Sequence, residues 1–235
     1  MKHSRPEMVI FDAGRTLIDY TQVDTLRGVQ ALMEHVTANP RSLMPEEVDR
    51  FTNETFAQFE ACRKKLFEVH EQTVLKLVYD LLELKFDCSI ADIERIIWYE
   101  SSVVEPVPGA GQALEKLKQL GIRTAVIGNL DFSGYLLKER LNALFPGNEF
   151  EFVIASSDYG LRKPMRDIFR AGIAKTGLKP ERIWYVGDKV MVDVDGSRAA
   201  GMVPVLYKCK RNTYSTLPEN LIVLNDFSEL TELMK

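Results

Sequence analysis

Polar side chains that could do chemistry stand at the ends of short apolar runs. Asp12, Asn129 and Asp188 each follow a run of the kind that forms a strand buried on both faces. Two more charged residues, Lys163 and Asp193, lie in loops beside such run ends. Because the carboxyl ends of parallel strands lie along one edge of a sheet, we expect these groups to converge. Carboxylate oxygens suit Mg²⁺, a lysine attracts a phosphate, and a carboxylate beside both is a plausible nucleophile.

A parallel sheet must position these groups, and the C-terminal half of the chain has the matching pattern. Short apolar runs alternate there with amphipathic helical segments, which predicts βαβ units. One further run lies near the N-terminus, directly before Asp12. The predicted strands are residues 8–11, 124–127, 152–155, 183–186, 203–206 and 221–224. We therefore expect an α/β fold built on a parallel sheet.

Between the first predicted strand and the others, the pattern is helical. From Thr21 to about Ser101, apolar residues recur at spacings of three and four, which predicts about four helices with no strand between them. Thr21-x-x-Asp24 and Ser89-x-x-Asp92 resemble the capping boxes that begin helices. The segment is therefore expected to be a small helical bundle inserted into the α/β domain.

The composition limits the class of protein and its partners. The 235 residues are 46% hydrophobic and 27% charged, as in a soluble globular protein. The net charge of −4 gives no basic field for nucleic acid, and no run reaches the ~18 apolar residues of a membrane span. The N-terminal residues show no leader pattern. Three widely spaced cysteines predict free thiols in a reducing cytoplasm, and the oligomeric state is left open.

Four segments resemble, in order, the motifs of a known family. They are residues 11–17 (Phe-Asp-Ala-Gly-Arg-Thr-Leu), 126–129 (Val-Ile-Gly-Asn), 160–164 (Gly-Leu-Arg-Lys-Pro) and 186–202, which begins Val-Gly-Asp. On these motifs the chain resembles the haloacid dehalogenase-like hydrolase superfamily over almost its full length. The resemblance implies a Rossmann-like core domain of residues 1–17 and 103–235, with an inserted helical cap domain of residues 18–102.

The resemblance also implies a role for each polar residue. Asp12 would be the nucleophile that accepts the phosphoryl group, and it would also bind Mg²⁺. Asp188 would be a second metal ligand, and Asp193 would support the metal directly or through water. Lys163 would neutralise the phosphoryl group and Asp12. Asn129 would hold the phosphate or orient Asp12.

The chain departs from the family's motifs at three positions. Phosphatases of the family carry a second Asp two residues after the nucleophile, as general acid and base, where this chain has Gly14. Such catalysis is typically worth ~10²–10⁴-fold, so its loss predicts a slow enzyme, a different chemistry or none. The Gly14 carbonyl can still reach a metal. Arg15 replaces a usual Gly and could bind the phosphate or face the cap, while Gly128 replaces a hydroxyl residue and offers its backbone N–H.

The leading hypothesis is a Mg²⁺-dependent phosphatase that acts on a small phosphorylated metabolite admitted by the cap. The main alternative is a degenerate member that binds a phosphorylated ligand or a partner protein without turnover. Carbon–halogen hydrolysis also fits Gly14, but the family's dehalogenases need no metal and lack the pair found here as Gly187-Asp188. Phosphonate cleavage would need a cap lysine as Schiff base, and a charged helix face is more typical of solvated lysines. The cap lysines considered for this role are Lys64, Lys65 and Lys76.

Overall fold

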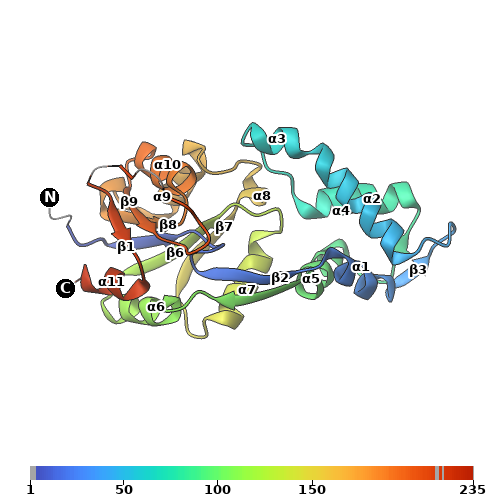
Figure 1. Ribbon diagram of the computed structural model, residues 1–235, viewed down its shortest axis with the longest axis horizontal. Helices are drawn as coiled ribbons and strands as arrows, with labels where there is room; N and C mark the ends of the chain where they lie inside the picture. Colours follow the sequence, from blue (N-terminus) through green and yellow to red (C-terminus); the bar gives the residue numbers. More distant parts are fainter. Residues whose placement is uncertain (1–3, 215–216, 219, 235) are drawn as a thin grey trace.

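A sheet of six parallel strands is the centre of the molecule. The computed structural model describes residues 4–214, 217–218 and 220–234; the first three residues of the segment inspected for a leader lie outside this range. The strand order is β10-β9-β8-β1-β6-β7, so that β1 lies between β8 and β6 (Figure 1). The strands are β1 (Met8–Phe11), β6 (Arg123–Gly128), β7 (Phe150–Ala155), β8 (Ile183–Gly187), β9 (Val203–Tyr207) and β10 (Ile222–Leu224).

Helices cover both faces of this sheet because alternate side chains of each strand point to opposite faces. Val9 and Phe11 belong to one buried cluster, which includes side chains of α6, α7 and α11. Met8 and Ile10 belong to a second cluster with Ile168 and other residues of α9. The helices of this part are α6 (Ala110–Gln119), α7 (Gly134–Leu144), α8 (Ser156–Tyr159), α9 (Arg166–Thr176), α10 (Asp195–Ala199) and α11 (Phe227–Glu232). The prediction of an α/β fold with a parallel Rossmann-like sheet is confirmed.

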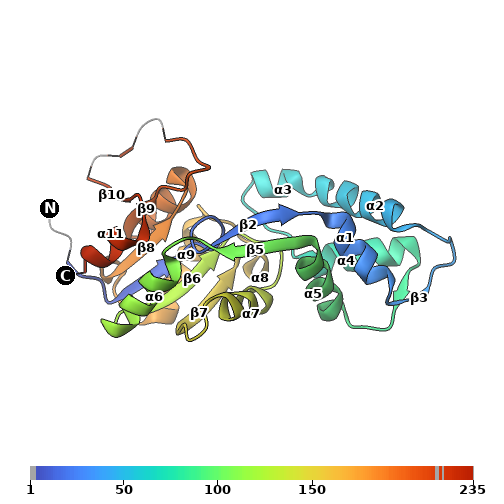
Figure 2. The ribbon, with the colours of Figure 1, turned by 60° about the horizontal axis from the view of Figure 1, so that its bottom comes forward.

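A helical segment extends from the carboxyl end of the sheet and has its own apolar cluster, which includes Val29, Leu75 and Ile93. An antiparallel ribbon of β2 (Ile18–Val23) and β5 (Ser102–Pro106) leads to it from the core (Figure 2). The helices are α1 (Thr25–Met33), α2 (Pro45–Gln58), α3 (Glu60–Lys64), α4 (Glu71–Leu82) and α5 (Ile90–Ser101).

The prediction that residues 21–101 contain no strand is wrong. The end of β2 lies inside this span, and β3 (Val36–Ala38) pairs antiparallel with β4 (Lys85–Phe86). Strands of two or three residues are too short to show an alternating pattern in the sequence. Thr21 lies in β2 and begins no capping box, since Asp24 alone caps α1. The capping box of Ser89 and Asp92 at the start of α5 is confirmed.

Two further observations concern the surroundings of the protein. Among the described residues, no helix is both long and apolar enough to cross a membrane. The cysteines Cys62, Cys88 and Cys209 are all free thiols.

Candidate active site

Four of the polar residues singled out in the sequence meet at the carboxyl edge of the sheet. The ammonium group of Lys163 is the centre of this group. It donates to Asp12 Oδ1, to Asp193 Oδ1 at 2.7 Å and to the hydroxyl of Tyr185 at 2.7 Å. Asp188 lies beside them, and the carboxylates of Asp12, Asp188 and Asp193 each place an oxygen within 4.8 Å of the others. All four side chains are buried.

The net negative charge of this cluster favours the binding of a cation. Three carboxylates and one ammonium group give a net charge of −2 when all are ionised. Asp188 Oδ1 is buried and has no hydrogen-bond partner among the described residues, which is costly unless an ion or water binds it. Hard carboxylate oxygens are the ligands that Mg²⁺ prefers. The cluster therefore fits Mg²⁺ by its donor set, its charge and its unpaired oxygen.

Burial and neighbouring charges shift the proton affinities of the cluster. Burial raises the pKa of Asp12 to about 6, against the opposing effect of Lys163, and Asp193 and Asp188 raise it further. Burial also raises the pKa of Asp188, which Lys189 and the amide of Asn212 partly offset. Burial alone would lower the pKa of Lys163, but the charges of Asp12 and Asp193 hold that pKa well above its usual value. The lysine is thus a permanent cation, and a bound metal would favour ionised Asp12.

Backbone geometry explains how Asp193 reaches the cluster. Asp193 lies in a π-helical turn, Val190–Val194, directly after the β8 loop, and its Oδ2 accepts from the N–H of Lys189 at 3.0 Å. A side chain at Gly187 would collide with the Asp193 carboxyl group. The Gly187-Asp188 pair of the sequence is therefore needed for the close approach of the two aspartates.

Asn129 contacts the backbone of Lys163 with both ends of its amide. Its Oδ1 accepts from the Lys163 N–H at 2.8 Å, and its Nδ2 donates to the Lys163 carbonyl at 2.9 Å. The sequence suggested that Asn129 holds the phosphate or orients Asp12. The hydrogen bonds of Asn129 in this structure fix the position of the Lys163 backbone, and its role toward a phosphate stays a prediction.

The two glycines that depart from the family's motifs have different surroundings. A Cβ atom at Gly14 would meet no atom within 4 Å, and its backbone does not adopt a positive φ. A Cβ at Gly128 would lie 3.2 Å from the Cβ of Ala13, tighter than an ordinary contact. The missing hydroxyl at position 128 thus has a packing reason, whereas the missing carboxylate at position 14 has none.

The Arg15 side chain contacts the loop after β9. The side chain is exposed, and its Nη1 donates to Asn212 Oδ1 at 3.2 Å. The backbone of Arg15 has φ of 65°, a left-handed conformation that suits the glycine usual at this position. Asn212 in turn donates to Asp188 Oδ2 at 2.6 Å, so Arg15 is linked to the cluster through one residue.

Several residues that support the cluster belong to no recognisable sequence motif. Tyr185 lies within an apolar strand, where only its hydroxyl hinted at a polar neighbour; that hydroxyl donates to the Ile127 carbonyl at 2.8 Å. Asn212 and Tyr214 come from the loop after β9 and both donate to the Asp188 carbonyl. This loop has no motif, so its contacts could not be read from a pattern.

The helical segment also contacts the loop that carries Lys163. Glu68 has a fully buried side chain that accepts from Ser156 Oγ at 2.7 Å, from Arg63 Nε at 3.1 Å and from Arg162. The Glu68 N–H donates to the Gly160 carbonyl at 3.0 Å, and Phe67 pairs with Leu161 in an antiparallel bridge. Arg162, the residue before Lys163, is therefore linked to the helical segment by its ion pair with Glu68 and by the hydrogen bond from its N–H to the Leu66 carbonyl.

A cavity of about 270 Å³ lies between the helical segment and the core. Aromatic side chains of both parts line it, among them Tyr20, Trp98 and Phe132. The buried carboxyl group of Glu71 also faces it, and burial, followed by the charges of Asp131 and Glu94, raises the pKa of Glu71 well above its usual value. None of the four cluster residues is among the residues that line this cavity, and the same holds for a cavity of about 420 Å³ at the amino end of β6.

Comparison with known proteins agrees with this geometry. The model of the family described as haloacid dehalogenase-like hydrolase matches residues 6–201, which include all of the cluster. The chain belongs to this family. Its membership makes it a hydrolase, built on the parallel sheet that positions Asp12, Lys163, Asp188 and Asp193.

Three individual relatives share between 17% and 30% sequence identity with this chain. A glyceraldehyde 3-phosphate phosphatase of Methanocaldococcus jannaschii is 30% identical over 64% of this chain and 67% of that protein. Another, of Pyrococcus furiosus, is 26% identical over 87% of this chain and 81% of that protein. The solved structure of a 2-haloacid dehalogenase from Pseudomonas syringae pv. Tomato DC3000 covers 97% of both chains, with a TM-score of 0.64 and 17% identity. At that identity the likeness shows the fold alone.

Proposed function

We propose that this hydrolase is a Mg²⁺-dependent phosphatase in which Asp12 accepts the phosphoryl group of a small phosphorylated metabolite. The observation that carries the proposal is the buried cluster of three carboxylates around Lys163, with one unpaired oxygen on Asp188. The phosphatase names of the curated relatives support the same reaction class. The free thiols favour a reducing compartment, and we place the protein in the cytoplasm.

The roles that we propose for the residues combine their contacts with the motifs of the family. Asp12, Asp188 and the Gly14 carbonyl would hold Mg²⁺, with Asp193 supporting it. The bound metal would neutralise charge on the phosphoryl oxygens. Lys163 would keep Asp12 ionised and attract the phosphate, and Asn129 would hold Lys163 in place.

The reaction has two balanced steps. An oxygen of Asp12 attacks phosphorus, the bond to the leaving oxygen breaks, and the leaving oxygen takes a proton from solvent water. Water then attacks the aspartyl phosphate, releases inorganic phosphate and returns Asp12 to its carboxylate. Gly14 has no side chain to supply or accept either proton, so we expect the second step to be slow.

The helical segment, residues 18–102, would act as a cap that admits the substrate. The cavity of about 270 Å³ between cap and core is large enough for the organic part of a small phosphate ester. Burial raises the pKa of Glu71 well above its usual value, which favours the protonated carboxyl group; in that form it can donate a hydrogen bond to a carbonyl or hydroxyl oxygen there. A three-carbon phosphorylated aldehyde, the substrate class in the relatives' names, is the first candidate.

The test is phosphate release from p-nitrophenyl phosphate and from a panel of small phosphate esters, with and without Mg²⁺. We expect Mg²⁺-dependent release that Asp12→Asn abolishes. The missing acid and base at Gly14 favours one other candidate, a member that binds phosphorylated ligands without turnover. Metal-dependent ligand binding combined with equal, slow release by the parent and Asp12→Asn would establish that candidate and refute the phosphatase.

A further inference from the structure

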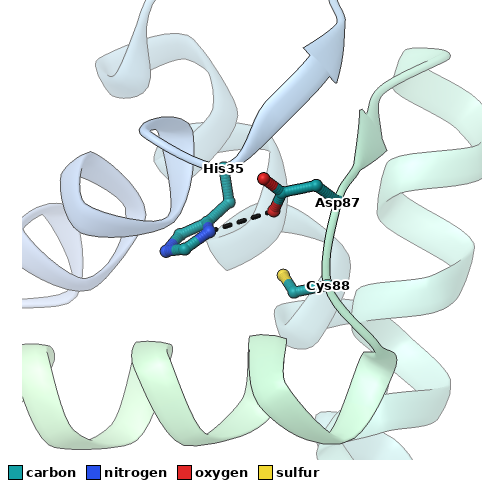
Figure 3. A group of neighbouring side chains, drawn as sticks. All are labelled: His35, Asp87 and Cys88. Carbon is teal, nitrogen blue, oxygen red and sulfur yellow. Dashed lines mark hydrogen bonds and ion pairs between the residues drawn. The ribbon is translucent and has the colours of Figure 1, made fainter.

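A second group of side chains that could bind a metal lies in the helical segment, separate from the cluster around Lys163. His35, Asp87 and Cys88 each offer a ligand atom within 4.8 Å of the other two. His35 Nδ1 and Asp87 Oδ1 lie 3.0 Å apart, and the Cys88 sulfur faces the same space (Figure 3). The three residues are exposed or half-buried, so an ion can enter from solvent.

The β3–β4 pair brings these residues together from distant positions. His35 directly precedes β3, and Asp87 directly follows β4. The Asp87 N–H donates to the His35 carbonyl at 3.1 Å, which continues the antiparallel pairing of Val36 with Phe86. Cys88 is the next residue, at the turn into α5. The backbones are thus fixed, and only exposed side chains need to adjust.

From this geometry we propose that His35, Asp87 and Cys88 form a Zn²⁺ site with one position open to water. Imidazole nitrogen, thiolate sulfur and carboxylate oxygen are the donors that Zn²⁺ takes, whereas Mg²⁺ avoids sulfur and nitrogen. Tetrahedral zinc places its ligand atoms roughly 3.3–3.6 Å from one another. The observed separations, from 3.0 Å to at most 4.8 Å, bracket that value.

The charges around the site favour a cation. The carboxylates of Asp87 and Asp92 are both near the Cys88 thiol. Asp92 is held at the start of α5 by Ser89, so its charge stays beside the site. Both carboxylates would attract a bound cation. Bound Zn²⁺ would also link residues 52 apart in sequence, which should stabilise the helical segment.

The experiment uses Co²⁺ as a spectroscopic probe on the full chain, in the presence of excess Mg²⁺. We expect one equivalent of Co²⁺ to give a thiolate-to-metal charge-transfer band and the intense visible bands of four-coordinate Co²⁺. Zn²⁺ should displace Co²⁺ and raise the unfolding temperature. Cys88→Ser should abolish the charge-transfer band, while the matched control Cys62→Ser, at an exposed thiol of α3, should leave it unchanged.

The affinity for Zn²⁺ distinguishes a specific metal site from chance binding at the surface. Loss of even an outer-shell partner typically costs 10–100-fold in metal affinity. Loss of the direct ligand in His35→Ala should therefore weaken Zn²⁺ binding by at least about tenfold in calorimetry. Circular dichroism checks that each variant folds. Binding that saturates only at millimolar Zn²⁺, or a charge-transfer band that survives Cys88→Ser, would overturn the proposal. Neither result depends on phosphatase activity.

Discussion

Two clusters of this chain each place their possible metal-ligand atoms within 4.8 Å of one another, but they differ in donor type and in burial. The cluster around Lys163 is all oxygen, is buried, and contains its own counter-ion. The cluster of His35, Asp87 and Cys88 mixes nitrogen, oxygen and sulfur and lies open to solvent. Donor type is the reason why we propose Mg²⁺ for the first and Zn²⁺ for the second. Burial decides how much each interaction contributes, because water screens exposed charges.

The largest difference should appear in turnover. We expect Asp12→Asn to lower phosphate release by about 10³-fold or more, because the variant lacks the nucleophile. The matched control in the exposed cluster is Asp87→Asn, which should turn over like the parent. The measurement is steady-state release from p-nitrophenyl phosphate with Mg²⁺. Equal losses in both variants would remove the functional distinction between the clusters.

Stability should also respond more strongly to the buried cluster. Lys163→Met would leave Asp12 and Asp193 without their counter-ion, and breaking a buried ion pair typically costs 3–5 kcal/mol of unfolding free energy, so we expect a loss of ~3 kcal/mol. Mg²⁺ should reduce the loss. Lys189→Met, at an exposed lysine next to Asp188, is the control, with an expected change below ~1 kcal/mol. Urea unfolding with and without Mg²⁺ measures both, and similar losses would refute the role of burial.

Adding a carboxylate to the buried cluster should accelerate the reaction. Gly14→Asp has open space for its Cβ and needs no backbone change. A general base at this position should raise turnover by roughly one to three decades, somewhat less than the ~10²–10⁴-fold that such groups typically contribute. Pre-steady-state measurement should show a burst in the parent, since dephosphorylation is slow, and a smaller burst in the variant. A parent that turns over rapidly without a burst would mean that another residue supplies the base.

The contrast between the clusters also explains what the sequence could reveal. Asp12, Asn129 and Asp188 follow strands that are long and apolar enough to be recognised, so their convergence at one sheet edge was predictable. His35 and Asp87 flank strands of three and two residues, which leave no readable period. The contacts of Arg15 and Tyr185 depend on side-chain direction, which sequence spacing does not give. The sheet was therefore predictable, but the partners that tune its cluster were not.

Smaller changes in stability and turnover are expected from contacts between the helical segment and the core. Glu68 is buried and accepts from Arg63 and Arg162, so Glu68→Gln should cost ~2 kcal/mol of unfolding free energy, the usual range for hydrogen bonds to charged groups being 1.5–3. Because Arg162 precedes Lys163, kcat on p-nitrophenyl phosphate should fall more than KM changes. Glu83→Gln, at an exposed ion pair with Arg41, is the control and should affect neither quantity. An unchanged kcat in Glu68→Gln would show that the contact is structural only.

The smallest effect is expected at a half-buried pair, His70 with Asp158, whose Nε2 and Oδ1 lie 3.7 Å apart. The interaction with the Asp158 carboxylate, followed by the charge of Glu94, raises the pKa of His70 above 6.5. Because the folded state binds this proton more tightly than the unfolded state, the pair stabilises the fold fully below pH 6.5. That contribution is lost as the pH rises through the raised pKa.

The matched comparison for this pair is parent against His70→Gln, in urea unfolding at several pH values. Since His70 is only partly buried, solvent screening should limit the pH-dependent part of the difference in unfolding free energy to about 0.2–1 kcal/mol, present at pH 6 and absent at pH 9. Loss of the helix cap, in which His70 Nδ1 accepts from the Gln72 N–H, adds a constant part at the higher pH values. His35→Gln, without added metal, is the exposed control, and its pair with Asp87 should contribute less than His70. A difference that grows with pH would have the wrong sign for a raised pKa. A larger effect at His35 than at His70 would contradict the rule that burial sets the strength of each pair.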